Sequence, residues 1–212
     1  MVYLSQYICI SVKGSGSLRD VFTPVSALID EKLKEEVSII AAIDGRCASG
    51  KTTLANRLSE HYGCSVIHMD HFFLKPEQRT AKRLETPGGN VDYERVLREV
   101  ITPLKEKKDV SYCPYDCQSG RLQAPIRVKN SKIVIIEGAY SCHPALFDSY
   151  DLKIFLTVDK SEQLKRLMER EPATKIEAFK TKWIPLEEKY FSAFEVEEKC
   201  DGVFSTSENF YL

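Results

Sequence analysis

The chain of 212 residues is 43% hydrophobic and 29% charged, the proportions of a soluble globular protein, and its length suits one α/β domain rather than two. Its formal net charge of −1 argues against a nucleic-acid-binding face large enough to bias the composition. No apolar run approaches the roughly 18 residues of a membrane span. The seven cysteines are scattered, without a C-x-x-C pair or a secretory leader, so we expect a cytoplasmic protein with free thiols. Cys113 and Cys117 could instead ligate a metal ion, although no second ligand pair accompanies them.

The N-terminal part of the chain precedes the main motifs. Residues 1–13 have the β-branched and aromatic content of a strand, and we treat residues 1–20 as an extension without an assigned role. Residues 24–36 predict an amphipathic helix with Thr23 as N-cap and Pro24 at the first helical position. Its apolar side chains share one face, which predicts packing on a sheet, and they are Val25, Leu28, Ile29 and Leu33.

A strand, a glycine-rich loop and a helix then follow one another. The apolar run 37–43 is typical of a strand buried on both faces, and residues 53–62 are typical of a helix. The loop between them fits the pattern G-x-x-x-x-G-K-[ST], in which glycines let consecutive N–H groups surround a polyphosphate. Lys51 would reach the β/γ-phosphates, and the Thr52 hydroxyl would bind the Mg²⁺ that bridges them. The alternative is a flexible turn without a ligand. The expected nucleotide-binding residues are Gly45, Arg46, Cys47, Ala48, Ser49, Gly50, Lys51, Thr52 and Thr53.

The second predicted strand, residues 64–70, ends in an acid. In an open parallel sheet, ligands bind outside the carboxyl ends of the strands, so Asp70 would face the phosphates across a cleft. A carboxylate there can accept the proton of an attacking hydroxyl or help to hold Mg²⁺. The alternative is an aspartate that only caps the next segment. We expect His68 in the core, whereas His71 suits a substrate contact and a structural role equally.

A long connection and a β-ribbon follow. Loops as long as residues 72–91 are usually functional or mobile. The next predicted helix begins after Asp92 and is disturbed by Pro103 near its end. Residues 110–115 and 126–129 predict two short strands that are joined by a turn and stand off the main sheet. Near the tip of this ribbon we expect Tyr115, Asp116 and Arg121.

The next buried strand, residues 132–136, is also followed by an acid, Glu137. Acids that close successive parallel strands converge on one sheet edge, where a metal–phosphate complex would sit. We therefore expect Glu137 to support the magnesium ion through water and Asp70 to lie beside it. A further strand is predicted over residues 152–158.

The helix predicted between residues 159 and 171 carries two arginines on one face. Arg166 and Arg170 are four residues apart, so they could form a cationic lid over the transferred phosphate. The alternative is a surface ion pair between Glu162 and Arg166.

The C-terminal part completes the fold. Pro172 is expected to break the chain before a helix over residues 174–184, and Pro185 to open another that extends to residue 199. A last short strand is predicted at residues 203–204. An aromatic stripe is assigned to the core and consists of Trp183, Tyr190, Phe191 and Phe194.

The order of these elements predicts a three-layer α/β/α sandwich around a parallel sheet, the P-loop NTPase fold, with a small β-ribbon and a helical lid. We expect one domain over residues 1–212, in which residues 71–130 form the acceptor side and residues 159–184 the lid.

The ordered set of motifs resembles the uridine kinase/phosphoribulokinase/pantothenate kinase group of P-loop kinases over most of residues 38–206. The motifs are GRCASGKTT, MDHFF, VDYERV, YDCQSGR, IIEGAY and the late arginine-bearing helix. The resemblance implies that Asp70 is the catalytic base, that Glu137 lies near metal and phosphates, and that Arg166 or Arg170 embraces the phosphoryl groups. The expected catalytic residues are therefore Lys51, Asp70, Arg166 and Arg170. The expected acceptor-site residues are Asp70, His71, Phe73, Tyr115, Asp116 and Arg121.

The chain departs from uridine kinases where the acceptor would bind. Residues 85–89 (ETPGG) replace an Asn-Phe-Asp-like triplet whose acid contacts ribose, and Cys117 and Gly120 stand where an aromatic residue and a histidine would hold the pyrimidine. The lid also lacks a second Arg-Gly-Arg cluster. A kinase of a small hydroxyl compound is therefore better supported than any named acceptor.

We therefore expect an ATP- and Mg²⁺-dependent phosphotransferase that acts on a hydroxyl of a nucleoside or related metabolite, without nucleic-acid or membrane partners. Two alternatives stay open: a nucleoside monophosphate kinase, for which Arg79, Arg83 and Arg95 could bind phosphate, and a non-catalytic ATP-binding regulator. The choice between ATP and GTP and a homo-oligomeric state are also open, although the chain has no Asn-Lys-x-Asp guanine reader.

Overall fold

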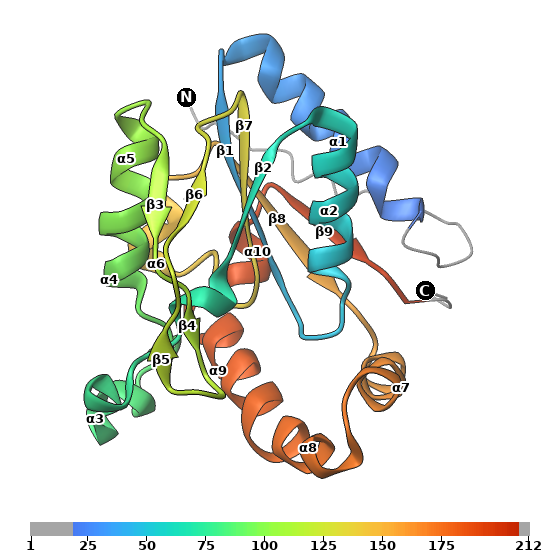
Figure 1. The fold of residues 1–212 in the computed structure, drawn as a ribbon. Coiled ribbons are helices and arrows are strands. Elements are labelled where there is room, and N and C mark those ends of the chain that lie inside the picture. Colours follow the sequence, from blue (N-terminus) through green and yellow to red (C-terminus); the bar gives the residue numbers. More distant parts are fainter. Residues whose placement is uncertain (1–18, 208–212) are drawn as a thin grey trace, which may run out of the picture.

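A central sheet of five parallel strands organises the fold (Figure 1). The computed structural model describes residues 19–207, so the strand predicted within residues 1–13 lies outside the described residues. The strand order is β2-β7-β1-β8-β9. The strands are β1 (Ile39–Gly45), β2 (Ser65–His68), β7 (Ile133–Glu137), β8 (Leu152–Thr157) and β9 (Gly202–Ser205).

Helices cover both faces of the sheet, which confirms the predicted three-layer architecture. Because side chains alternate along a strand, Ile39, Ala41 and Ile43 of β1 face one layer and Ala42 faces the other. The first layer contains α1 (Arg19–Glu35) and α2 (Lys51–Tyr62). The second layer contains α4 (Tyr93–Val96), η3 (Leu97–Ile101), α5 (Thr102–Lys105), α6 (Pro144–Phe147), α9 (Ile184–Phe194) and α10 (Val196–Lys199).

Helix α1 begins earlier than predicted. Thr23 is not its N-cap, because the helix already starts at Arg19 and contains Pro24. The apolar face extends in front of the proline: Val21 and Val25 are both buried and one turn apart. A proline so near the start removes few helical hydrogen bonds, so burial of this face outweighs it.

The ends of two strands also differ from the prediction. Val37 is 87% exposed, and β1 starts only at Ile39. Strand β2 ends at His68, so Asp70 lies in η1 (Met69–Phe72), a single turn of 3-10 helix. That turn carries the carboxylate beyond the sheet edge rather than in line with the strand.

Two helices run through prolines that were predicted to disturb or divide them. The segments α4, η3 and α5 are consecutive and contain Pro103, and the segments α8 (Ala173–Ala178), η4 (Phe179–Trp183) and α9 are consecutive and contain Pro185. Both η3 and η4 are π-helical, and each ends two residues before its proline. The wider turn relieves the clash between a proline ring and the preceding turn, so neither helix breaks.

The remaining elements lie outside the main sheet. The long connection contains two short helices, η2 (Pro76–Gln78) and α3 (Ala81–Glu85). The ribbon is present as two antiparallel pairs: β3 (Val110–Tyr112) with β6 (Ile126–Val128), and β4 (Tyr115–Asp116) with β5 (Arg121–Leu122). Helix α7 (Lys160–Arg170) leads into α8, and together with α9 these helices flank the lower edge of the sheet in Figure 1.

Within residues 19–207, the helices are all too short or too polar to serve as a membrane-spanning segment. The six cysteines in the same range are free thiols.

Candidate active site

The glycine-rich loop joins β1 to α2 at the carboxyl edge of the sheet. Gly45 has a φ of +134°, and a Cβ there would lie 2.0 Å from the carbonyl oxygen of Leu156, so only glycine fits. Gly50, with a φ of 92°, immediately precedes α2. The Lys51 ammonium folds back over the loop and donates hydrogen bonds to the carbonyl oxygens of Gly45 (2.7 Å) and Arg46 (2.9 Å). The expected strand–loop–helix arrangement is therefore present.

A cavity of about 1300 Å³ opens over this loop. Its walls come from the loop and α2, from η1 and the connection after it, and from α7, α8, η4 and α9. The predicted residues that line it are Cys47, Ala48, Gly50, Lys51, Thr52, Thr53, Asp70, Phe73, Glu137, Arg166 and Arg170.

The other predicted substrate residues lie farther along the acceptor side. His71, Tyr115 and Asp116 line a second cavity of about 440 Å³, which shares Asp70 and Phe73 with the first. Arg121 lines neither cavity and is exposed on β5. The tip of the ribbon therefore lies beside Asp70 and Phe73, but the sequence could not show which of its side chains line a cavity.

An acidic cluster forms where β2 and β7 end. Glu137 is 4% exposed, and its carboxylate accepts a hydrogen bond from the Thr52 hydroxyl (3.1 Å). His68, opposite Glu137 in the strand register, places Nδ1 2.5 Å from the same carboxylate. This hydrogen bond raises the pKa of His68. The prediction that His68 is a core residue was therefore wrong, because it is half-buried and paired with Glu137.

Asp70 lines the cavity together with Lys51 and Thr52 of the loop. Partial removal of water from around its carboxylate raises its pKa, and the nearby negative charge of Glu137 raises it further. A carboxylate with a raised pKa is a stronger base than a free aspartate, so it is better matched to removing a proton from a hydroxyl group.

The oxygen atoms near the loop suit magnesium. A hydroxyl and a carboxylate are hard ligands, and Mg²⁺ usually keeps several water molecules and binds substrate phosphates alongside one or two protein ligands. Thr52 and Glu137 fit that pattern. Within the described part of the chain, no three His, Cys, Asp or Glu side chains converge closely enough to hold a metal ion by themselves. The protein would thus share the ion with a bound phosphate.

Arg166 makes contacts in two directions. Its Nε donates to Glu162 at 2.9 Å, which is the ion pair that the sequence offered as the alternative to a lid. Its Nη1 also reaches the carbonyl oxygen of Ala48 in the loop at 3.3 Å, and its side chain lines the cavity. Arg170 lines the cavity too, with its side chain 54% exposed and Nε 3.0 Å from Glu171.

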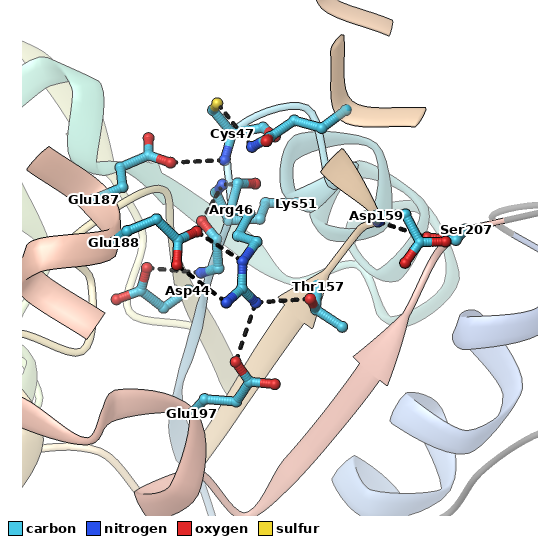
Figure 2. Close-up of polar contacts among 12 residues, drawn as sticks. Asp44, Arg46, Cys47, Lys51, Thr157, Asp159, Glu187, Glu188, Glu197 and Ser207 are labelled. Carbon is cyan, nitrogen blue, oxygen red and sulfur yellow. Dashed lines mark hydrogen bonds and ion pairs between the residues drawn. The ribbon is translucent and has the colours of Figure 1, made fainter. Parts of the chain in front are cut away.

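The side chain of Arg46 does not line the cavity and points toward Glu188, Glu197 and Thr157 (Figure 2). It forms a two-pronged ion pair with Glu188 (Nε to Oε1, 2.8 Å; Nη2 to Oε2, 3.2 Å). Its Nη1 contacts Glu197 at 3.0 Å and the Thr157 hydroxyl at 2.7 Å. The guanidinium group therefore ties the loop to α9 and α10 and is not available to phosphate.

Asp44, which the motif analysis did not single out, anchors the loop from below. It is fully buried and accepts hydrogen bonds from the backbone N–H groups of Gly45 (2.7 Å), Tyr140 (3.2 Å) and Cys142 (2.8 Å). The hydroxyl of Tyr190 on α9 donates a fourth, at 2.9 Å. The signal that could have found Asp44 is the one that pointed to Glu137: an acid that closes a buried apolar strand.

Helices α7 and α9 both hold Cys47. Glu187 on α9 accepts a hydrogen bond from the Cys47 N–H at 2.9 Å, and Gln163 on α7 donates one to the Cys47 carbonyl oxygen at 3.0 Å. Trp183, assigned to the core from the aromatic stripe, lines the cavity instead, whereas Tyr190 and Phe191 are buried as expected. Trp183 is the last residue of the π-helical turn η4, and this wider turn breaks the uniform helical spacing from which the stripe was inferred.

The arginines considered for a nucleoside monophosphate do not act together. Arg83 is paired with Glu94 (2.6 Å), and Arg95 is 5% exposed and paired with Glu99 (2.8 Å). Only Arg79 of the three lines the main cavity, and its guanidinium group donates to the Leu74 carbonyl oxygen.

Similarity to known proteins covers the part of the chain that carries this site. A family model described as an AAA domain matches residues 42–185. Uridine-cytidine kinase D of Dictyostelium discoideum is 28% identical over 119 residues, which are 56% of this chain but only 23% of that protein.

Two solved structures share the fold over nearly their whole length. A possible uridine kinase from Bacillus stearothermophilus has a TM-score of 0.66 at 22% identity, with 88% of this chain and 98% of that chain covered. A proposed fructose transport system kinase from Silicibacter sp. TM1040 also has a TM-score of 0.66 at 22% identity, with 86% and 98% covered. At this identity the likeness establishes the architecture and leaves the substrate open.

Proposed function

This chain belongs to the AAA domain family of P-loop proteins, and from that premise we propose that it is an ATP- and Mg²⁺-dependent kinase of a small hydroxyl compound. The observation that carries the proposal is the convergence of Lys51, Thr52, Asp70 and Glu137 on one cavity, which Arg166 and Arg170 also line. A phosphate loop alone serves many reactions, but a carboxylate with a raised pKa in the same cavity suits transfer to an acceptor rather than nucleotide binding only.

Each residue has a distinct part in the proposed reaction. The loop N–H groups and Lys51 would bind the β- and γ-phosphates, and the two arginines would neutralise charge on the group in transfer. Thr52 and, through water, Glu137 would hold Mg²⁺, which supplies charge neutralisation when bound. Asp70 would orient the acceptor hydroxyl and take its proton as the oxygen attacks the γ-phosphorus.

Closure around the reactants would exclude water. Lysine and arginine side chains on α7, α8 and η4 line one wall of the cavity, where they would draw the lid toward the phosphates. The acceptor would enter between η1 and the ribbon, where Phe73 and the second cavity lie. The departures from uridine kinases fall in this region, so a nucleoside or a related metabolite alcohol is the broadest class that we propose.

The experiment that tests the proposal is acceptor-dependent ADP release with MgATP. The panel comprises nucleosides, nucleoside monophosphates, pantothenate and sugar or sugar-phosphate alcohols, and the Lys51→Ala variant is the blank. We expect one class of alcohol to raise the rate above the blank. ATP binding without stimulation by any acceptor would favour a non-catalytic regulator over a kinase.

A further inference from the structure

A carboxylate occupies the phosphate loop. The N–H group of Cys47, which belongs to the run of loop donors meant for phosphate, instead donates to Glu187 at 2.9 Å (Figure 2). Glu187 is only 7% exposed, although it lines the main cavity. Because Glu187 already accepts a hydrogen bond from this loop N–H group, a phosphate that binds the loop must displace the carboxylate or share the donor with it.

The position of Glu187 corresponds to the terminal phosphate. The Lys51 ammonium lies at the start of the loop, bonded to the carbonyl oxygens of Gly45 and Arg46, and its charge acts on Glu187. Because this lysine reaches the β- and γ-phosphates in phosphate loops, a group beside it stands at the γ end of the nucleotide.

The backbone that carries Glu187 is held on its C-terminal side. The next residue, Glu188, is paired with Arg46, and Tyr190 bonds to buried Asp44. Tyr190 itself is fully buried. Helix α9 therefore cannot retreat from the loop without breaking these contacts, so the carboxylate and a terminal phosphate would lie within a few ångströms of each other, where like charges repel.

We propose that Glu187 holds the terminal-phosphate position of the loop in the free protein and takes up one proton from solvent when a nucleoside triphosphate binds. The neutral carboxyl group then donates a hydrogen bond to a phosphate oxygen, in place of the one that its anion accepted from Cys47. This inference rests on the proposed function, since it concerns the same nucleotide site.

The surroundings of Glu187 favour this exchange. Burial raises its pKa to about 7, and Asp44 on β1 raises it as well, whereas Lys51 on α2 and the hydrogen bonds from Cys47 lower it. Tyr140, in the loop after β7, is the other titratable group that interacts with it. A carboxyl group poised near neutrality accepts a proton at little cost when an anion arrives.

The sign of the pH dependence follows. Below pH 7 Glu187 is already protonated in the free protein, so its titration should not make the affinity for ATP change with pH. Above pH 7 the proton must be taken up on binding, so the Kd for ATP should rise by up to about tenfold per pH unit. ADP lacks the terminal phosphate and should show a weaker dependence.

The test measures binding of MgADP and of a non-hydrolysable MgATP analogue between pH 7 and 9, above the second phosphate pKa of about 6. Calorimetry in two buffers with different ionisation enthalpies counts the protons taken up by the wild-type protein, independently of any variant. Glu187→Gln removes the titration, and Glu188→Gln removes the same charge from the neighbouring position that faces Arg46. Thermal melting checks that both variants fold.

We expect proton uptake that approaches one per analogue bound by the wild-type protein at pH 8.5. Glu187→Gln should bind the analogue about 30-fold more tightly than wild type at that pH, without a pH slope, whereas Glu188→Gln should keep the slope. Analogue binding that is independent of pH, with no proton uptake, would overturn this inference and leave the kinase proposal standing. Failure of every protein to bind either nucleotide would overturn both.

Discussion

Removing one hydroxyl group from the core tests whether Asp44 anchors α9 to the phosphate loop. In Tyr190→Phe, the Asp44 carboxylate loses the donor at 2.9 Å and keeps the three backbone N–H groups. A buried hydrogen bond to a charged group contributes about 1.5–3 kcal/mol, so the free energy of unfolding should fall by that amount. For a protein of this length, that corresponds to a decrease in Tm of roughly 3–12 °C. The Tyr190 hydroxyl stabilises the ionised form of Asp44. The difference in unfolding free energy between the wild-type protein and Tyr190→Phe should therefore become smaller as the pH falls through the raised pKa of Asp44.

Urea unfolding followed by the fluorescence of the single tryptophan, Trp183, measures the change. The matched control is Tyr150→Phe, because the Tyr150 hydroxyl is also buried but has no hydrogen-bond partner among the described residues. Its removal should leave stability unchanged or raise it by about 1 kcal/mol. Equal losses in the two variants would refute the reasoning, since the loss would then reflect packing of the rings rather than the bond to Asp44.

Three further predictions concern the loop and the base. Gly45→Ala should destabilise the protein by about 3 kcal/mol or more in urea unfolding, because its Cβ would meet the Leu156 carbonyl oxygen; a mild effect would contradict the loop geometry. Arg46→Gln should cost up to about 1 kcal/mol of stability through loss of the partly exposed pair with Glu188. The same variant should change the Kd for ATP less than threefold. A large loss of affinity would instead indicate that Arg46 binds phosphate. Asp70→Asn should lower kcat by about 10²- to 10⁴-fold and leave ATP affinity nearly intact; parallel loss of both in steady-state and binding assays would rule out the base assignment.

The parts of the fold and the site that are encoded locally could be predicted from the sequence. Apolar runs of strand length locate the buried strands, and the loop motif locates the phosphate-binding edge because the backbone path of this loop requires glycine, as at Gly45. Asp70 and Glu137 follow from the same logic, since acids after parallel strands must gather at one edge. The structure differs for Asp70 by one turn of helix, which the strand pattern could not anticipate.

The parts that depend on distant contacts could not be predicted. Glu187 lies in the sequence LEEK, which is typical of an exposed helix face, and its partner Cys47 is 140 residues away. Arg46 matches a variable position of the motif, so nothing local shows that it pairs with α9. At the prolines, local rules predict that a helix ends, but the helices continue through them. Buried side chains on both sides of the proline, such as Ile176 and Tyr190, stabilise the continuous helix.

The two π-helical turns suggest how different side chains of a helix could come to line the cavity. Each is equivalent to one additional residue in an otherwise regular α-helix, and one residue corresponds to a rotation of about 100°. In the helix that ends at Phe194, the half beyond η4 is fixed by Tyr190 and Phe191 in the core, while Phe179 and Trp183 line the cavity. Deleting one residue from η4 would turn the N-terminal half without disturbing that core. Within this architecture, a change in chain length of one residue is therefore sufficient to present a different set of side chains to the acceptor.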